Sequence, residues 1–364
     1  MRYQDPLKEI LRRTRPHWDR GEIRASVRSA FIKTMMCGTQ ALGAEVYASY
    51  NEEKVIYHTC KSSACASCGY KATVQWQRER WTALPGVPYK GITFTMPSVL
   101  WSVFRDNLQL TRFLPKLAAV TIQTWARERY GLDVGVIAVL HTFNGRLEFN
   151  CHVHTMVTAG GWQSSGAWIS SIYYDPQWLT SLWRRGVVQL LRAAMQAGLL
   201  GTEIGADVLG AILAEQERRW WSVNIQSLGS KEHFLRYAGR YARRPSIAAR
   251  RIVHIGEERV TFWAKDKRLG SRVNVQCLLT DFVDRLARHI PERYQHAVRS
   301  FGLFAPRKLR KTSAAIFISL GQIQRPRPKR VPWRVSIQRD FGWDPLLDRT
   351  GQRMRWVGRR NPIT

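Results

Sequence analysis

Two stretches near the middle of the chain have the patterns of β-strands: the first begins with a continuous apolar run, and the second alternates between apolar and polar positions. They read VGVIAVLHTF at 134–143 and LEFNCHVHTMV at 147–157. Asn144 and Gly145 lie between them, and this dipeptide is typical of a β-hairpin turn. A third stretch, GITFTM at 91–96, alternates in the same way. The pattern therefore predicts an antiparallel sheet.

Apolar residues three and four positions apart predict helices before and after these strands. The expected helical regions are residues 1–35, 71–81, 98–130, 176–226 and 230–244. Gly131 and Pro245 favour helix ends at two of these boundaries. A further hairpin is expected at 251–265. This mixture of helices and antiparallel hairpins predicts an α+β fold with a central antiparallel sheet.

Shifts in composition divide the chain into three predicted domains. The Pro- and Gly-rich segment LPGVPYKG at 84–91 separates an N-terminal domain, residues 1–85, from a central domain, residues 90–268. Residues 269–364 form a basic C-terminal region. Within it, QRPRPKRVP at 324–332 is expected to be an extended arm, because its prolines prevent a regular helix.

The charge of the chain is strongly positive. Its 57 Lys and Arg residues against 27 Asp and Glu give a formal net charge of +30 and a pI near 10.7. This excess favours nucleic acid as a partner over an anionic membrane surface, since no long amphipathic basic helix is visible. The sequence shows no signal peptide and no apolar run of membrane-spanning length, which predicts a cytoplasmic protein without a membrane partner.

Two histidines lie two residues apart in the predicted strand at 147–157. Alternate residues of a strand point to one face, so His152 and His154 project together while Cys151 and Val153 point the other way. Buried imidazoles need hydrogen-bond partners and are a poor choice for an apolar core. They are good metal ligands, because one ring nitrogen can bind the ion while the other is oriented by an acceptor.

Two tyrosines four residues apart share one face of the helix predicted at 230–244. One interpretation is a core-facing aromatic stripe; the other is that Tyr237 and Tyr241 are nucleophiles. A tyrosine hydroxyl can attack a phosphodiester and hold one DNA end covalently when a metal ion polarises the phosphate. Basic residues around the pair could bind DNA and stabilise the phosphate in the transition state, namely Arg236, Arg240, Arg243 and Arg244.

A cysteine cluster lies in the N-terminal domain. The spacing Cys60-x4-Cys65-x2-Cys68 in a cytosolic, basic chain predicts a structural zinc site rather than buried free thiols. The fourth ligand is either Cys37 or His58. Elsewhere in the chain, Cys151 and Cys277 are interpreted as buried strand thiols.

The segment FNCHVHTMVTAGG (149–161), followed by LRYAGRYARRPSIAARRI (235–252), resembles the rolling-circle insertion-sequence transposases of the HUH superfamily, in the two-tyrosine group. ITFTMP, VTFWAKDK and RYQHAVRSFGLFAPR extend the resemblance over most of the chain from about residue 30. The resemblance implies an HUH nuclease domain at 90–268, after a zinc-binding, DNA-binding domain at 1–85.

The resemblance also implies an activity. Such an enzyme nicks and joins single-stranded DNA at transposon ends and targets through a 5′-phosphotyrosine intermediate, as a metal-dependent tyrosine endonuclease and strand transferase. Tyr237 and Tyr241 would be the nucleophiles, and His152 and His154 would bind Mg²⁺ or Mn²⁺. A third ligand is expected; His141 is the first candidate, and Glu232 and His233 are alternatives. No Walker-type glycine loop is present, in agreement with chemistry that needs no ATP.

The chain departs from the family pattern near the cysteines. Relatives carry a further CxxC upstream of Cys60, where this sequence has Tyr47 and Tyr50, so at most one zinc ion is expected. Two other functions are weighed: an HUH replication initiator or relaxase of plasmid type, and a non-catalytic zinc protein that binds nucleic acid. For the transposase, a prokaryotic cytoplasm and association with the nucleoid are expected.

Overall fold

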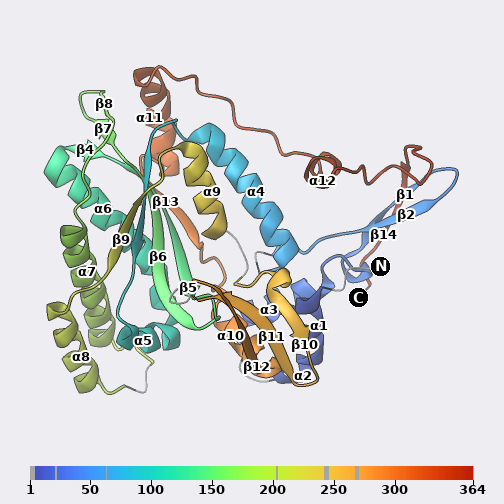
Figure 1. Ribbon diagram of the computed structural model, residues 1–364, viewed down its shortest axis with the longest axis horizontal. Coiled ribbons are helices and arrows are strands. Elements are labelled where there is room, and N and C mark those ends of the chain that lie inside the picture. Colours follow the sequence, from blue (N-terminus) through green and yellow to red (C-terminus); the bar gives the residue numbers. More distant parts are fainter. Residues whose placement is uncertain are drawn as a thin grey trace.

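A five-stranded antiparallel sheet forms the centre of the computed structural model, which describes residues 5–20, 23–62, 64–201, 204–241, 246–266 and 270–363 (Figure 1). The strand order is β13-β5-β6-β3-β9. The strands are β3 (Tyr89–Phe94), β5 (Gly135–Phe143), β6 (Phe149–Thr158), β9 (Val223–Ser227) and β13 (Val298–Gly302). The predicted α+β fold with a central antiparallel sheet is confirmed.

Helices cover both faces of this sheet (Figure 1). One face is covered by α5 (Trp101–Asp106), α6 (Leu114–Tyr130), α7 (Pro176–Gln196) and α8 (Ala206–Arg218). The other face is covered by α4 (Ala66–Ala83), α9 (Lys231–Tyr241) and α11 (Pro306–Ser319). Gly131 ends α6 in the left-handed conformation, at φ 65°, as the sequence predicts. No helix in the described part of the chain combines the length and apolar character needed to span a membrane.

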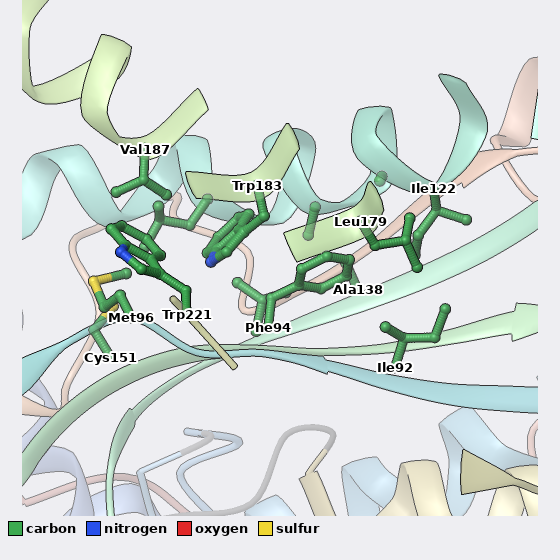
Figure 2. Packing of buried hydrophobic residues seen from close by; sticks show 14 of the residues in the cluster. Ile92, Phe94, Met96, Ile122, Ala138, Cys151, Leu179, Trp183, Val187 and Trp221 are labelled. Atoms are coloured by element: carbon green, nitrogen blue, oxygen red, sulfur yellow. The ribbon is translucent and has the colours of Figure 1, made fainter. Parts of the chain in front are cut away.

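Strand alternation separates two cores. On β5, Val136 and Ala138 face α6 and α7, whereas Ile137 and Val139 face α4 and α9. Figure 2 shows the first core, where the indole of Trp183 packs against Phe94 with ring centroids 5.1 Å apart. Burying large apolar side chains of this kind contributes about 1.5–3 kcal/mol each. Both faces of the sheet are therefore fixed by packing.

A second sheet packs against the N-terminal helices. It contains β10 (Ile252–Ile255), β11 (Arg259–Lys265) and β12 (Arg272–Leu278), and the first two form the predicted hairpin. Its buried side chains share a core with the helices α1 (Pro6–Arg13), α2 (Arg15–Trp18), α3 (Ala25–Met36) and α10 (Leu279–Arg288). The N-terminal helices and residues 252–288, far apart in the sequence, therefore build this unit.

A third sheet joins distant parts of the sequence, in the order β14-β1-β2. Its strands are β1 (Ala44–Ala48), β2 (Glu53–Tyr57) and β14 (Arg355–Arg360), and the helix α12 (Trp333–Phe341) precedes β14. Residues 322–332 have no regular secondary structure, so the predicted basic arm is extended. The domain boundaries near 85–90 and 268–269 stay predictions, although β13 belongs to the central sheet and β14 pairs with β1.

Short elements complete the fold. A small sheet in the order β4-β7-β8 consists of β4 (Leu132–Asp133), β7 (Gly161–Gln163) and β8 (Trp168–Ile169). The 3₁₀ helices are η1 (Gln40–Leu42), η2 (Ser98–Leu100), η3 (Leu108–Phe113) and η4 (Ala249–Arg251).

The hairpin between β5 and β6 exists, but its turn is longer than Asn144-Gly145 suggests. Asn144 Oδ1 accepts hydrogen bonds from the backbone N–H groups of Arg146 and Glu148, at 2.8 and 3.1 Å. Leu147 takes the positive φ of 61° and is buried against the N-terminal helices and second sheet. Burial of this leucine explains why the chain extends the turn beyond two residues.

Candidate active site and zinc centre

Three histidines meet on the face of the central sheet that α4 and α9 cover. His152 and His154 point to this face, while Cys151 and Val153 are buried on the opposite one, as alternation predicts. The strand register pairs His141 on β5 with His152 on β6. Ring centroids lie 4.8–5.5 Å apart, and each residue offers a ring nitrogen within 4.8 Å of the others. We call these three residues the histidine cluster.

Hydrogen bonds orient two of the imidazoles. The Nδ1–H of His152 donates to the carbonyl oxygen of Asn150 at 2.8 Å, because a carbonyl can only accept. His154 Nδ1 lies 3.1 Å from Thr93 Oγ1, and Thr93 is the residue paired with His154 across β3 and β6. Both Nδ1 atoms are thus engaged, and the two Nε2 atoms face each other at 3.1 Å.

This donor set fits a divalent ion. Two ligands at right angles and ~2.1 Å from an octahedral ion lie about 3.0 Å apart, close to the observed separation of the Nε2 atoms. Imidazole nitrogen is a ligand for several divalent metals. When one ring nitrogen binds the metal, the other is usually held by a hydrogen-bond partner.

Tyr237 reaches the histidine cluster from α9. Its side chain is buried, and its Oη lies 3.4 Å from His154 Nδ1. The carbonyl oxygen of Leu235 accepts a hydrogen bond from Gln77 Nε2 on α4, which ties the two helices together. A Cβ at Gly239 would lie 2.2 Å from the same Gln77 nitrogen, so a larger residue there would displace the Gln77 side chain.

The other predicted residues of α9 differ in position. Tyr241 is the last helical residue, and only the backbone is described for Tyr241 and Arg240. Arg243 and Arg244 lie outside the described residues. Arg236 is exposed. Glu232 and His233, the alternative metal ligands, are also exposed and do not belong to the cluster.

Four cysteines meet at the start of α4. Cys37 follows α3, Cys60 follows β2, and Cys65 and Cys68 lie at the N-terminus of α4. The Sγ atom of Cys68 lies 3.6 Å from that of Cys37 and 3.7 Å from that of Cys60. Four sulfurs ~2.3 Å from a tetrahedral zinc ion are about 3.8 Å apart. The arrangement therefore fits zinc.

Hydrogen bonds within the cysteine cluster shift the pKa values of its thiols in opposite directions. Those from Cys37, Cys60 and Cys65 hold the pKa of the Cys68 thiol well below its usual range, whereas hydrogen bonds within the cluster raise the pKa of the Cys60 and Cys65 thiols. Thiolate is the form that binds zinc. In contrast, Cys151 is buried away from the cluster, and burial raises the pKa of its thiol.

Cys37, and not His58, lies with the other three cysteines. Both ring nitrogens of His58 have other partners: Nε2 lies 3.0 Å from Glu45 Oε1 and Nδ1 lies 3.1 Å from the carbonyl oxygen of Leu42. The cluster therefore consists of four cysteines, which favours Cys37 over His58 as the fourth ligand.

Comparison with known proteins decides the family. A model described as "Transposase zinc-binding domain", of IS91 type, matches residues 9–96, and one described as "Putative transposase" matches residues 135–312. The chain is 32% identical to the transposase of insertion sequence element IS801 from Pseudomonas savastanoi pv. phaseolicola, over 286 residues that cover 76% of this chain and 69% of the relative. The chain belongs to this family of insertion-sequence transposases.

A second relative agrees with this assignment. The transposase is 29% identical over 289 residues to the protein named "Putative transposase y4qJ" from Sinorhizobium fredii, with 75% and 73% of the two chains covered. No solved structure matches the chain. The zinc-binding match contains all four clustered cysteines, so the transposase has a structural zinc site in its N-terminal part. The other match contains the three clustered histidines and Tyr237.

Thr93 is the neighbour of the histidine cluster that sequence reasoning missed. It lies on the strand predicted from GITFTM, with the alternation that sends it to the same face as the histidines. Only the register between β3 and β6 brings it opposite His154, and register between strands far apart in sequence is not readable from alternation alone.

Proposed function

We propose that this transposase nicks and joins single-stranded DNA at transposon ends and targets through a 5′-phosphotyrosine intermediate. One observation carries the proposal: the Tyr237 hydroxyl lies beside three imidazoles that converge as a metal-ligand set, 3.4 Å from His154 Nδ1. A tyrosine hydroxyl next to such a set supports phosphoryl transfer to a phenol, because a bound metal ion would polarise the phosphate nearby.

The reaction exchanges one ester for another. The Tyr237 oxygen attacks the phosphorus, the bond to the 3′-oxygen of the preceding nucleotide breaks, and the phenol loses its proton while the leaving oxygen gains one. The DNA then carries its 5′-phosphate on tyrosine and ends in a free 3′-hydroxyl. Mg²⁺ or Mn²⁺ on His152 and His154, with His141 as third ligand, would polarise the phosphate. Attack by a 3′-hydroxyl on the phosphotyrosine reverses the exchange and joins strands without ATP.

The remaining residues of α9 have supporting roles in this proposal. Tyr241 lies one helical turn after Tyr237, so it could accept a second DNA end while the first is still bound. Arg236, Arg240, Arg243 and Arg244 would balance the negative charge of the phosphate. Attack by Tyr237 requires a polarised phosphate, because an unperturbed phenol is a weak nucleophile at neutral pH.

DNA binding would involve more than this helix. With a net charge of +30, the protein has a surplus of cations for phosphate contacts. We assign DNA-holding roles to the N-terminal zinc domain, residues 1–85, and to the basic region, residues 269–364, on either side of the nuclease domain, residues 90–268. The enzyme would act at the nucleoid in the cytoplasm of a prokaryote.

The test is a covalent-capture assay with single-stranded oligonucleotides of the element's ends. Wild-type protein with Mg²⁺ should form a protein–DNA adduct that resists denaturing gel electrophoresis. Tyr237→Phe with Tyr241→Phe, and separately His152→Ala with His154→Ala, should abolish the adduct. Tyr173→Phe is a matched control, because this exposed tyrosine lies next to Trp125 of α6, on the opposite side of the sheet from α9. An adduct that survives in the double tyrosine variant disproves the nucleophile assignment.

A further inference from the structure

A cavity lies between one residue of the histidine cluster and one residue of the cysteine cluster. Its volume is about 950 Å³, and its walls come from α3, the segment around Cys60, the end of β5 and residues 286–298. His141 of the histidine cluster and Cys60 of the cysteine cluster both line it. A molecule that fills the cavity therefore lies beside both His141 and Cys60.

The cavity walls carry an excess of positive charge. Among the described residues, the cationic side chains that line it are Arg24, Lys33, Lys61, Arg288 and Arg293. Glu292 is the one carboxylate in this lining, and the Arg24 guanidinium forms an ion pair with it. The remaining positive charges face the cavity without a compensating acid in its walls, which favours an anionic occupant.

Aromatic surface lies next to His141. The ring of Phe143 is stacked on the His141 imidazole, with centroids 5.1 Å apart and an angle of 18° between planes. Phe143 is partly accessible and lines the cavity. Rings beside cationic side chains are the surfaces on which unpaired bases stack, while the cations bind the phosphates.

The volume restricts the occupant further. Ligand pockets measure ~300–1,000 Å³, so this cavity lies at the upper end of that range. It has room for a few nucleotides of one strand and not for a double helix. We propose that the cavity binds the single-stranded DNA segment next to the phosphate that is cut, with phosphates toward Lys33 and Arg288 and a base against Phe143. The inference rests on the proposed function, since it takes the histidine cluster as the cutting site.

Binding of a fluorescein-labelled oligothymidylate tests the charged walls. Measurements use Tyr237→Phe protein, so that no covalent link contributes. Lys33→Gln with Arg288→Gln should weaken binding at least tenfold and reduce the slope of log K against log salt by about 1.4, since each phosphate contact on a single strand contributes ~0.7. Lys116→Gln with Arg129→Gln, two exposed cations of α6 on the opposite side of the sheet, is the matched control and should leave both quantities unchanged.

Ultraviolet crosslinking of the same oligothymidylate locates the strand. Crosslinks mapped by mass spectrometry should fall on the peptide that contains Phe143. Equal binding and equal salt slopes for the cavity variant and the control, or crosslinks confined to other elements, would overturn the proposal. The adduct assay on wild-type protein separates the two hypotheses: an adduct without these cavity effects refutes the cavity assignment alone, and cavity effects without an adduct refute the nicking reaction alone.

Discussion

The two metal-ligand clusters of this transposase are built in opposite ways. The histidine cluster lies on two adjacent strands whose register is fixed by hydrogen bonds and by cores on both faces. The cysteine cluster gathers ligands from the ends of α3, β2 and α4, and among the described residues its apolar cluster contains only the cysteines themselves. The fold thus prepares the first site in advance, whereas we expect the second to depend more on the ion to hold its segments together.

The largest effect expected from this difference is on stability, when ligands of the two clusters are removed in turn. Cys37→Ser should lose zinc and unfold the N-terminal part, because structural zinc contributes on the order of 10 kcal/mol in small zinc domains. His152→Ala with His154→Ala should abolish divalent-ion binding and leave the melting temperature nearly unchanged. Zinc analysis and calorimetry measure both outcomes.

His58→Ala is the control for the cysteine variant. Its imidazole is bonded to Glu45 and not to the cysteine cluster, so one zinc ion per chain should remain. If Cys37→Ser retained its zinc and His58→Ala lost it, the assignment of four cysteine ligands would be wrong.

A second, intermediate effect is on metal affinity, and it concerns the hydrogen bond that orients His154 in the histidine cluster. Thr93→Val keeps the shape of the side chain and removes the hydroxyl beside His154 Nδ1. Loss of such an orienting partner typically weakens metal affinity ~10–100-fold. Titration of Mn²⁺ by calorimetry measures the change, and Thr93→Ser should restore most of the affinity. Unchanged affinity in the valine variant would mean that the strands alone orient the imidazole.

A third effect, of similar size, concerns a histidine held by protein groups alone. His289 lies between Thr142 Oγ1 and the carbonyl oxygen of Leu147, and burial lowers the pKa of its imidazole to about 4. The unfolded chain therefore binds a proton at higher pH than the folded one, so His289 favours unfolding as the pH falls from about 6.5 toward 4. Between pH 7 and 5 this costs roughly 2 kcal/mol.

Denaturant unfolding at pH 7 and pH 5 tests this assignment. His289→Gln keeps polar atoms near Thr142 and Leu147 but does not titrate. The stability of this variant should depend less on pH than that of the wild type, by roughly 2 kcal/mol over that interval. The same pH dependence in both proteins would show that His289 is not the group responsible.

The contrast between the clusters also explains what the sequence could predict. The HxH pair and its common face follow from strand alternation, and the CxxC follows from spacing, because both features are local. Other features depend on contacts between segments far apart in the chain and could not be predicted in this way. They are the place of Cys37 in the cysteine cluster, the position of Thr93 opposite His154, and the edge strands β9 and β13. Val223–Ser227 in particular lies in a region where the apolar spacing predicted helix.

The extended turn at Leu147 is a further example. Asn144-Gly145 predicts a two-residue turn, yet burial of Leu147 against the N-terminal helices and second sheet outweighs that local preference. The spacing of residues did not by itself identify a function, whereas the resemblance to the transposase family did. The comparisons with known proteins confirm the family. The catalytic roles of Tyr237 and Tyr241 stay predictions until the adduct is measured.

The pairing of β1 with β14 also orders events during synthesis. Ala44–Ala48 leaves the ribosome long before its partner Arg355–Arg360, with about 300 residues between β2 and β14. At ~5–20 residues per second, translation leaves the edge of β1 open for roughly 15–60 s. The nascent chain must therefore keep an exposed strand edge from pairing with other chains while its cysteines are already available to zinc.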